Sequence, residues 1–165
     1  MPGSAIIDHE ALGWAPGTVG ELDHHLLKAP SVKLRGAHPG PAGDTVYCID
    51  LRLRRPNAGE SLGSAESHSL EHFLLEGFQR LLPRHFIGVG VMGCRTGFYL
   101  TLHNEGRRAR IEDALETILR GVLAATAVPY ARIDQCGHWR DHDLARAQAV
   151  AREVLERRAA WRDIA

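Results

Sequence analysis

Hydrophobic residues recur along this chain with two different periods, and these periods predict its elements. From Thr45 to Arg54, apolar and polar residues alternate, which predicts a strand with one buried and one polar face. Two short apolar runs, Phe86–Met92 and Phe98–His103, flank a glycine-containing loop and predict a hairpin or two adjacent strands. The first third of the chain is rich in glycine and proline, which is typical of loops around short extended pieces.

The second period is helical. Apolar residues at three- and four-residue spacing predict a helix that Ser67 caps and Pro83 ends. The same spacing predicts a second helix over residues 111–123, and a third over residues 144–155 after the acidic cap candidates Asp141 and Asp143. This mixture predicts an α+β fold, in which an antiparallel β-sheet is covered on one side by amphipathic helices. We expect an irregular tail over residues 1–17 and a single domain over residues 18–165.

The charges balance, with 20 basic and 20 acidic residues among 165. A net charge of zero argues against a general nucleic-acid binder and against a polybasic membrane-surface protein. No apolar run approaches the roughly 18 residues that a membrane helix needs, and the first residues lack the pattern of a signal peptide. Three cysteines, an odd number in a chain of this size, favour reduced thiols. We therefore expect a cytoplasmic protein with no nucleic-acid or membrane partner.

The strongest chemical motif is His68-Ser69-Leu70-Glu71-His72, inside the first predicted helix. Residues four apart on a helix lie one above the other, so His68 and His72 can reach one metal ion. Glu71 projects near the same edge, where a carboxylate can take a proton from a metal-bound group. The same H-x-x-E-H pattern occurs in the inverzincin metallopeptidases. Two histidines at this spacing also arise by chance in a chain with 10 histidines, but the glutamate between them makes chance the weaker explanation.

Two thiols lie in settings that suit chemistry. A catalytic divalent metal needs a third protein ligand and an open position for substrate, and Cys136 in its short Cys-Gly loop is one candidate. A lone thiol is more often buried and inert, so Cys136 carries little weight by itself. Cys94 lies between Gly93 and Arg95, where a sharp turn can expose the thiol and a nearby cation would favour the thiolate. A buried thiol at a strand end is the alternative for Cys94.

Taken together, these segments resemble the LuxS family, the S-ribosylhomocysteine lyases, with this chain as a divergent member. Five blocks between about residues 20 and 155 carry the resemblance in the family's order: Leu22-Asp23-His24 with Ala29-Pro30; Asp50-Leu51-Arg52 with Pro56-Asn57; His68-Ser69-Leu70-Glu71-His72; Met92-Gly93-Cys94-Arg95-Thr96-Gly97-Phe98-Tyr99; and Gln135-Cys136-Gly137 with Asp141-His142-Asp143-Leu144. The third and fourth blocks are highly specific when they occur together, and either alone would be weaker.

The resemblance implies a LuxS-like metalloenzyme fold, with the catalytic domain over residues 18–165. It implies a homodimer with two active sites at the interface between its subunits. By the same resemblance, His68, His72 and Cys136 hold one divalent metal per subunit. The metal expected in the working enzyme is iron(II), with zinc(II) as the alternative.

The resemblance also implies the reaction and the residues that perform it. Glu71 and Cys94 match the family's two proton-transfer residues, while His24 and Arg52 match positions that line the substrate pocket. The reaction cleaves the thioether of S-ribosylhomocysteine to homocysteine and 4,5-dihydroxy-2,3-pentanedione, the precursor of autoinducer-2. These residues suit that chemistry, because moving the sugar carbonyl toward the sulfur needs a Lewis acid on the oxygens and a base that shuttles protons between carbons. Arg52 can keep Cys94 ionised or bind substrate, and the sequence does not decide between these roles.

The chain departs from the family pattern at several positions expected near the pocket. Gly88 stands where the family has an acidic residue, and Val19-Gly20 stand where it has a Ser-Phe pair. Ser67 replaces an isoleucine before the H-x-L-E-H block, and Ser31 replaces a tyrosine after Ala-Pro. The metal set and the catalytic pair are intact, so the chemistry is better supported than the exact substrate.

Two other functions stay open from the sequence. A metallopeptidase-like hydrolase would use Glu71 to activate metal-bound water and would not need Cys94. A non-catalytic metal-binding paralogue would hold the metal but would release no thiol from S-ribosylhomocysteine.

Overall fold

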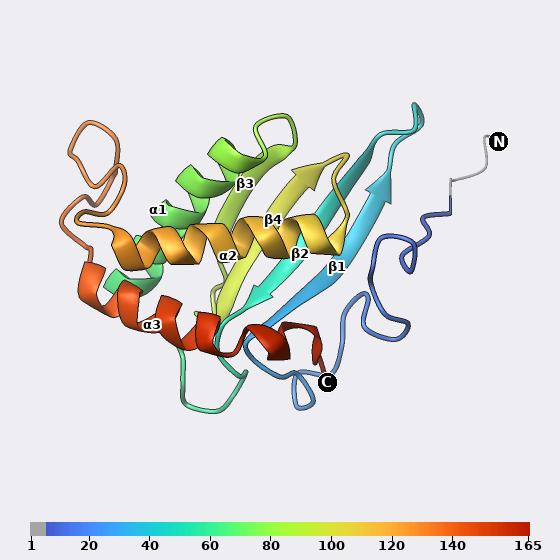
Figure 1. The fold of residues 1–165 in the computed structure, drawn as a ribbon, viewed down its shortest axis with the longest axis horizontal. Coiled ribbons are helices and arrows are strands. Elements are labelled where there is room, and N and C mark those ends of the chain that lie inside the picture. The colour runs from blue at the N-terminus through green and yellow to red at the C-terminus, as the bar shows by residue number, and fades with distance from the viewer. Residues whose placement is uncertain (1–5) are drawn as a thin grey trace.

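A computed structural model describes residues 6–165, in which three helices pack on a four-stranded antiparallel sheet (Figure 1). The order of strands across the sheet is β1-β2-β4-β3. The strands are β1 (Ser31–Pro39), β2 (Thr45–Arg52), β3 (Phe86–Val91) and β4 (Gly97–His103). The helices are α1 (Ser64–Leu81), α2 (Arg108–Ala124) and α3 (Leu144–Glu156), followed by the short 3-10 helix η1 (Arg158–Arg162). The predicted α+β fold class is confirmed.

Alternation along the central strands builds the core. Ile49 of β2 pairs with Leu100 of β4, and Leu51 pairs with Phe98. All four side chains are fully buried, because they point to the sheet face that the helices cover. The predicted strand over Thr45–Arg54 and the predicted hairpin are therefore confirmed, with small differences at their ends.

Helix α2 lies across the sheet, with α1 and α3 packed beside it (Figure 1). Its apolar positions recur at helical spacing and face the core, as the sequence predicts; they are Ile111, Ala114, Leu115, Ile118, Leu119 and Val122. Helix α3 begins after Asp143, whose Oδ1 accepts a hydrogen bond of 2.9 Å from the backbone N–H of Arg146. Asp143 is therefore the cap that the sequence proposed for this helix.

One local prediction is wrong, and another is incomplete. Helix α1 begins at Ser64, and its cap is Gly63, whose N–H donates to Oε1 of Glu66 at 2.6 Å. Ser67 lies inside the helix and donates to the carbonyl of Ser64, so it is not the cap. The Gly- and Pro-rich first third also contains a full strand, β1, which a register shift near Gly36 interrupts.

The N-terminal segment carries neither helix nor strand over residues 6–17. Residues 1–5 of the predicted tail lie outside the described residues. Trp14 nevertheless belongs to the core, where 1% of its surface is exposed and its indole N–H donates to the carbonyl of Gly106 at 2.8 Å. The boundary at residue 18 stays a prediction. In the part of the chain that the structure describes, no helix is long and apolar enough to cross a membrane.

The second face of the sheet is polar but not fully exposed. Lys33, Asp50 and Arg52 lie on this face, and each is only 3% exposed. The Arg52 guanidinium donates to Oδ2 of Asp50 at 2.7 Å, and Lys33 donates to the carbonyl of Gly20. A buried charge pair on a sheet face needs such partners, because removal from water is costly. Arg52 of this pair also belongs to the candidate active site.

Candidate active site

Four potential metal ligands gather where α1 meets the segment between α2 and α3. His68 and His72 come from α1, whereas Cys136 and His142 come from that segment, and one ligand atom from each lies within 4.8 Å of the others. Sγ of Cys136 lies 3.4 Å from Nε2 of His68 and 3.8 Å from Nε2 of His142. The structure thus brings together the three ligands expected from the sequence and adds His142. We call these four residues the metal cluster.

Backbone carbonyls orient the two helical imidazoles. Nδ1 of His68 lies 2.8 Å from the carbonyl oxygen of Asp141, and Nδ1 of His72 lies 2.6 Å from that of Pro129. A carbonyl only accepts, so each Nδ1 carries the proton and each Nε2 keeps a lone pair. Metal-binding histidines are typically held in this way by their second nitrogen. The metal cluster is therefore arranged for binding through Nε2.

A serine performs the same task for His142. The Ser69 hydroxyl donates to the carbonyl of Ala65 at 2.7 Å, so its oxygen accepts from Nδ1 of His142 at 3.1 Å. Burial, together with repulsion from His68 and His72, lowers the pKa of His142 to about 4. A neutral imidazole with a free Nε2 is the form that binds metal.

Sequence reasoning assigned no role to His142. Its position six residues after Cys136, within one loop, was the signal that could have found it. The thiol of Cys136 also has a donor nearby, since the backbone N–H of His138 lies 3.4 Å from its sulfur. Three imidazoles and one thiol form a donor set that suits zinc or iron(II).

Glu71 lies on α1 beside His72 and is partly buried. Its carboxylate makes no hydrogen bond or ion pair with any residue that the structure describes. An acceptor without a partner, next to a metal ligand in the chain, can exchange protons with a bound substrate. The structure therefore leaves Glu71 available for the role that the sequence predicts.

Cys94 lies in the turn between β3 and β4, at the edge of a separate hollow of about 260 Å³. His24 and Thr96 line the same hollow, together with residues 55–57 and 59–61. None of the four metal-cluster residues lines it. His24 and Cys94, both predicted from the sequence, therefore share one site, and the metal cluster is not part of that hollow.

Arg52 is buried behind this hollow. It is not one of the described residues that line the hollow. Its Nη1 donates to Oγ1 of Thr96 at 2.6 Å and lies 4.0 Å from Sγ of Cys94. Burial opposes ionisation of Cys94, but the hydrogen bonds from Thr96 and the charge of Arg52 outweigh it, so the pKa of the thiol lies below its ordinary value. Of the two roles left open for Arg52, these contacts favour support of the thiolate.

The residues that depart from the family pattern lie away from this hollow. Val19, Gly20, Ser31, Ser67 and Gly88 are all absent from its lining. At Gly88 a Cβ atom would meet nothing within 4 Å, so the missing acidic side chain leaves open space there. These departures are therefore not part of the walls around Cys94.

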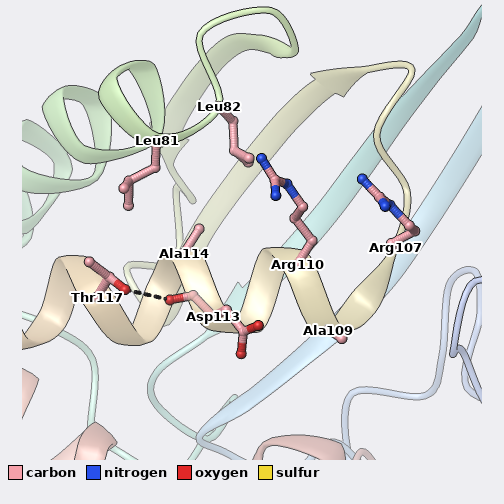
Figure 2. A pocket seen from close by; sticks show the side chains of 8 residues that line it. All are labelled: Leu81, Leu82, Arg107, Ala109, Arg110, Asp113, Ala114 and Thr117. Atoms are coloured by element: carbon pink, nitrogen blue, oxygen red, sulfur yellow. Dashed lines mark hydrogen bonds between the residues drawn. The ribbon is translucent and has the colours of Figure 1, made fainter.

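A second hollow, of about 460 Å³, lies between the end of α1 and α2 (Figure 2). Its charged side chains include Arg107 and Arg110. Both pair with Glu105, which is only 2% exposed. None of the residues predicted for the site lines this hollow, and its arginines already have a partner. We therefore place the candidate chemistry at the metal cluster and at Cys94.

Comparisons with known proteins show which family the chain resembles. A family model described as S-Ribosylhomocysteinase (LuxS) matches residues 19–165. A protein of Halobacillus halophilus named S-ribosylhomocysteine lyase is 40% identical over 143 residues, which cover 87% of this chain and 93% of that relative. Proteins with the same name from Clostridium botulinum and Helicobacter pylori are 41% and 38% identical, over 83% and 87% of this chain and 89% and 91% of their own.

Proposed function

Because the chain belongs to the S-ribosylhomocysteinase (LuxS) family, we propose that it is a metal-dependent S-ribosylhomocysteine lyase. The proposed products are homocysteine and 4,5-dihydroxy-2,3-pentanedione. The observation that carries the proposal is the pairing of a His, His and Cys metal cluster with a separate thiol of lowered pKa. The substrate in this proposal is inferred from the relatives, since each is named for this lyase reaction.

The chemistry explains why both features are needed. The thioether carbon–sulfur bond breaks easily only when the sulfur is attached to the carbon β to a carbonyl, because the α carbon next to the carbonyl then loses a proton readily and the thiolate leaves from the β carbon. The sugar carbonyl must first migrate by successive enolisations, each moving a proton from one carbon to its neighbour. A metal bound at the cluster would polarise the sugar oxygens as a Lewis acid.

The chain's own residues divide the proton transfers. Cys94, as a thiolate, takes a proton from one carbon and returns it to the next. Glu71 moves protons among the sugar oxygens and assists the final elimination, in which the homocysteine thiolate leaves. His24 lines the hollow beside Cys94 and would contact the polar part of the substrate. Arg52 acts from behind, through its contacts with Thr96 and Cys94.

We propose iron(II) as the metal of the working enzyme, with zinc(II) able to occupy the same ligands. Imidazole and thiolate ligands accept both ions, so the donor set itself does not select between them. Metal analysis of protein purified without oxygen, from cells grown with both metals, tests this assignment. Zinc alone in active protein would contradict it.

We also propose that the protein is a homodimer with active sites shared between subunits. The hollow beside Cys94 contains no metal-cluster residue, yet one substrate must reach both. A second copy can supply the missing half of each site. This proposed arrangement gives each subunit's Cys94 a metal from its partner.

The lyase activity is tested with S-ribosylhomocysteine and reduced, iron(II)-loaded protein, following free homocysteine with a thiol reagent. C94A should lower the rate by at least about 100-fold, the usual contribution of a general base. C48A is the matched control, because it also removes one cysteine, but from β2 and outside the hollow. Absence of homocysteine release above the C94A level in the wild-type protein would refute the lyase.

The shared site is tested by mixing two inactive variants, C94A and H72A, under conditions that exchange subunits. Half of the dimers are then mixed, and each mixed dimer has one intact site of two, so about a quarter of wild-type activity should return. Sites contained within single subunits would return none. Sedimentation equilibrium of the wild-type protein provides the dimer mass independently.

The two other functions left open by the sequence gain no support from the relatives. A metallopeptidase-like hydrolase would keep its activity in C94A, and a non-catalytic paralogue would release no homocysteine at all.

We further propose that the protein works in the cytoplasm, where a catalytic thiol and a ligand thiol stay reduced. The described structure is consistent with this, because all three cysteines are free. There the product would serve the methyl cycle and supply autoinducer-2 for quorum sensing.

A further inference from the structure

We propose that Thr96 is a positioning residue that holds Cys94 in its thiolate form and passes the influence of Arg52 to it. The inference rests on the proposed function only in taking Cys94 as the proton-transfer group. It assigns a role to Thr96, which is neither a proposed metal ligand nor a proposed catalytic residue.

The hydroxyl oxygen of Thr96 accepts a hydrogen bond from Arg52. Nη1 of Arg52 can only donate, and it lies 2.6 Å from Oγ1 of Thr96. The other end of the guanidinium is held by Asp50, whose Oδ2 lies 2.7 Å from Nη2. Arg52 and Asp50 are both 3% exposed, so this arrangement is fixed by burial. The Thr96 hydroxyl therefore has its own proton free to donate elsewhere.

When Cys94 is ionised its sulfur can only accept, so the thiolate is the acceptor for that proton. Sγ of Cys94 lies 3.0 Å from Oγ1 of Thr96, whereas Nη1 of Arg52 lies 4.0 Å from the same sulfur. The backbone N–H of Thr96 also faces the sulfur. A donor that is itself polarised by a cation makes a stronger hydrogen bond to an anion. Thr96 is thus the main contact through which the buried arginine stabilises the thiolate.

The backbone holds Thr96 in place. Its side chain is buried, with 5% exposed, and its carbonyl accepts hydrogen bonds of 2.9 Å from the N–H groups of Leu53 and Arg54. A Cβ at Gly97 would overlap the carbonyl of Leu51, so glycine there allows β2 to approach closely. The hydroxyl is therefore held between Arg52 and Cys94.

Other charged groups around the thiol do not replace this contact. His24, Arg55 and Glu60 line the same hollow, and Asp50 lies behind Arg52. Arg95 is the neighbour in sequence, with a positive φ of 56° in the turn. Of the two side-chain hydrogen bonds to the Cys94 sulfur among the described residues, the one from Thr96 is the shorter. Removing the Thr96 hydroxyl should therefore change the pKa of the Cys94 thiol more than it changes the shape of the hollow.

The experiment measures the pKa of Cys94 in metal-loaded protein from its alkylation rate by iodoacetamide between pH 5 and pH 10. Peptide mass spectrometry separates Cys94 from Cys48 and Cys136. T96V should raise the pKa by about one unit or more, because a hydrogen bond to a charged group is lost, and alkylation at pH values below both pKa values should slow about tenfold. T96S keeps the hydroxyl and should stay near wild type. T117V removes an exposed threonine hydroxyl of α2 and should change nothing.

The lyase profile gives a second measure. The acid limb of kcat/KM should move to higher pH in T96V by the same amount as the thiol pKa, and T96S should restore it. If T96V does not fold by circular dichroism, T96A replaces it with the same expectation. A thiol pKa unchanged in T96V, or moved equally in T96S, would overturn the role of Thr96. Because alkylation needs no substrate, a shifted pKa without lyase activity would count against the proposed function alone.

Discussion

At the scale of single residues, Ser69 connects the helix to the metal cluster. Its side chain is fully buried on α1, where its hydroxyl donates to the carbonyl of Ala65 and accepts from Nδ1 of His142. The backbone N–H of Asp143 donates to the same oxygen at 2.9 Å. One hydroxyl thus fixes the tautomer of a ligand and the start of α3. Loss of such a supporting contact commonly weakens metal binding.

We expect S69A to lower metal affinity by about 10-fold or more, the usual range for a lost partner of a ligand. The matched control is S67A, because Ser67 is also a buried serine of α1 but bonds only to the carbonyl of Ser64. Affinity is measured by competition with a chromophoric chelator. Equal affinities in S69A and S67A would show that His142 does not depend on Ser69.

At the scale of elements, a glycine sets the distance between α1 and α2. A Cβ at Gly77 would overlap Cγ1 and Cδ1 of Ile118, so the two helices approach closely only because Gly77 has no side chain. Gly77 is five residues beyond His72 on the same helix. The close approach therefore helps to define where α1 holds its two histidines.

We expect G77A to destabilise the protein by about 1–3 kcal/mol, because the added methyl group overpacks the helix interface. G121A is the control, since Gly121 lies on α2 with nothing within 4 Å of an added Cβ. It should be neutral or stabilise by up to about 1 kcal/mol through helix propensity. Urea denaturation of both variants measures the difference. A G77A variant as stable as G121A would contradict the packing argument.

At the scale of the whole molecule, Glu112 joins the C-terminal segment to α2. This carboxylate is fully buried and accepts from Arg108 at 2.9 Å and from Arg162 at 2.7 Å. Arg108 also donates to the carbonyls of Val32 and Trp161, which connects β1 with η1. The buried Arg108–Glu112 pair thus holds together segments from three parts of the chain.

We expect E112A to cost about 3–5 kcal/mol of unfolding free energy, because it leaves the buried Arg108 without its partner. E76A is the control, since the Glu76–Arg80 pair on α1 is partly exposed and should contribute at most about 1 kcal/mol. Thermal and denaturant unfolding compare the two. Similar losses in both variants would refute a special role for the buried carboxylate.

Much of the fold was predictable from local patterns. Alternation around Ile49 and Leu51, the helical stripes, and the cap at Asp143 depend on neighbours in sequence, so a window of a few residues contains them. The bounds of strand β1 were not predicted, because Gly36, at a register shift, and Pro39 interrupt its alternation. The cap of α1 was misplaced because Ser67 is a common capping residue, whereas Gly63 uses its backbone with Glu66.

The sequence by itself determined the family, the helical His68 and His72 pair, and the thiols at Cys94 and Cys136, because motif spacing is written in the chain. Only the tertiary structure decided that His142 joins the metal cluster. It also decided that Arg52 is buried behind the Cys94 thiol and that Thr96 lies between Arg52 and that thiol. These contacts join segments more than 40 residues apart, as Arg52 and Thr96 are 44 apart and Ser69 and His142 are 73 apart. Such pairs form only when the sheet and the loop before α3 fold back on each other, which no local pattern encodes.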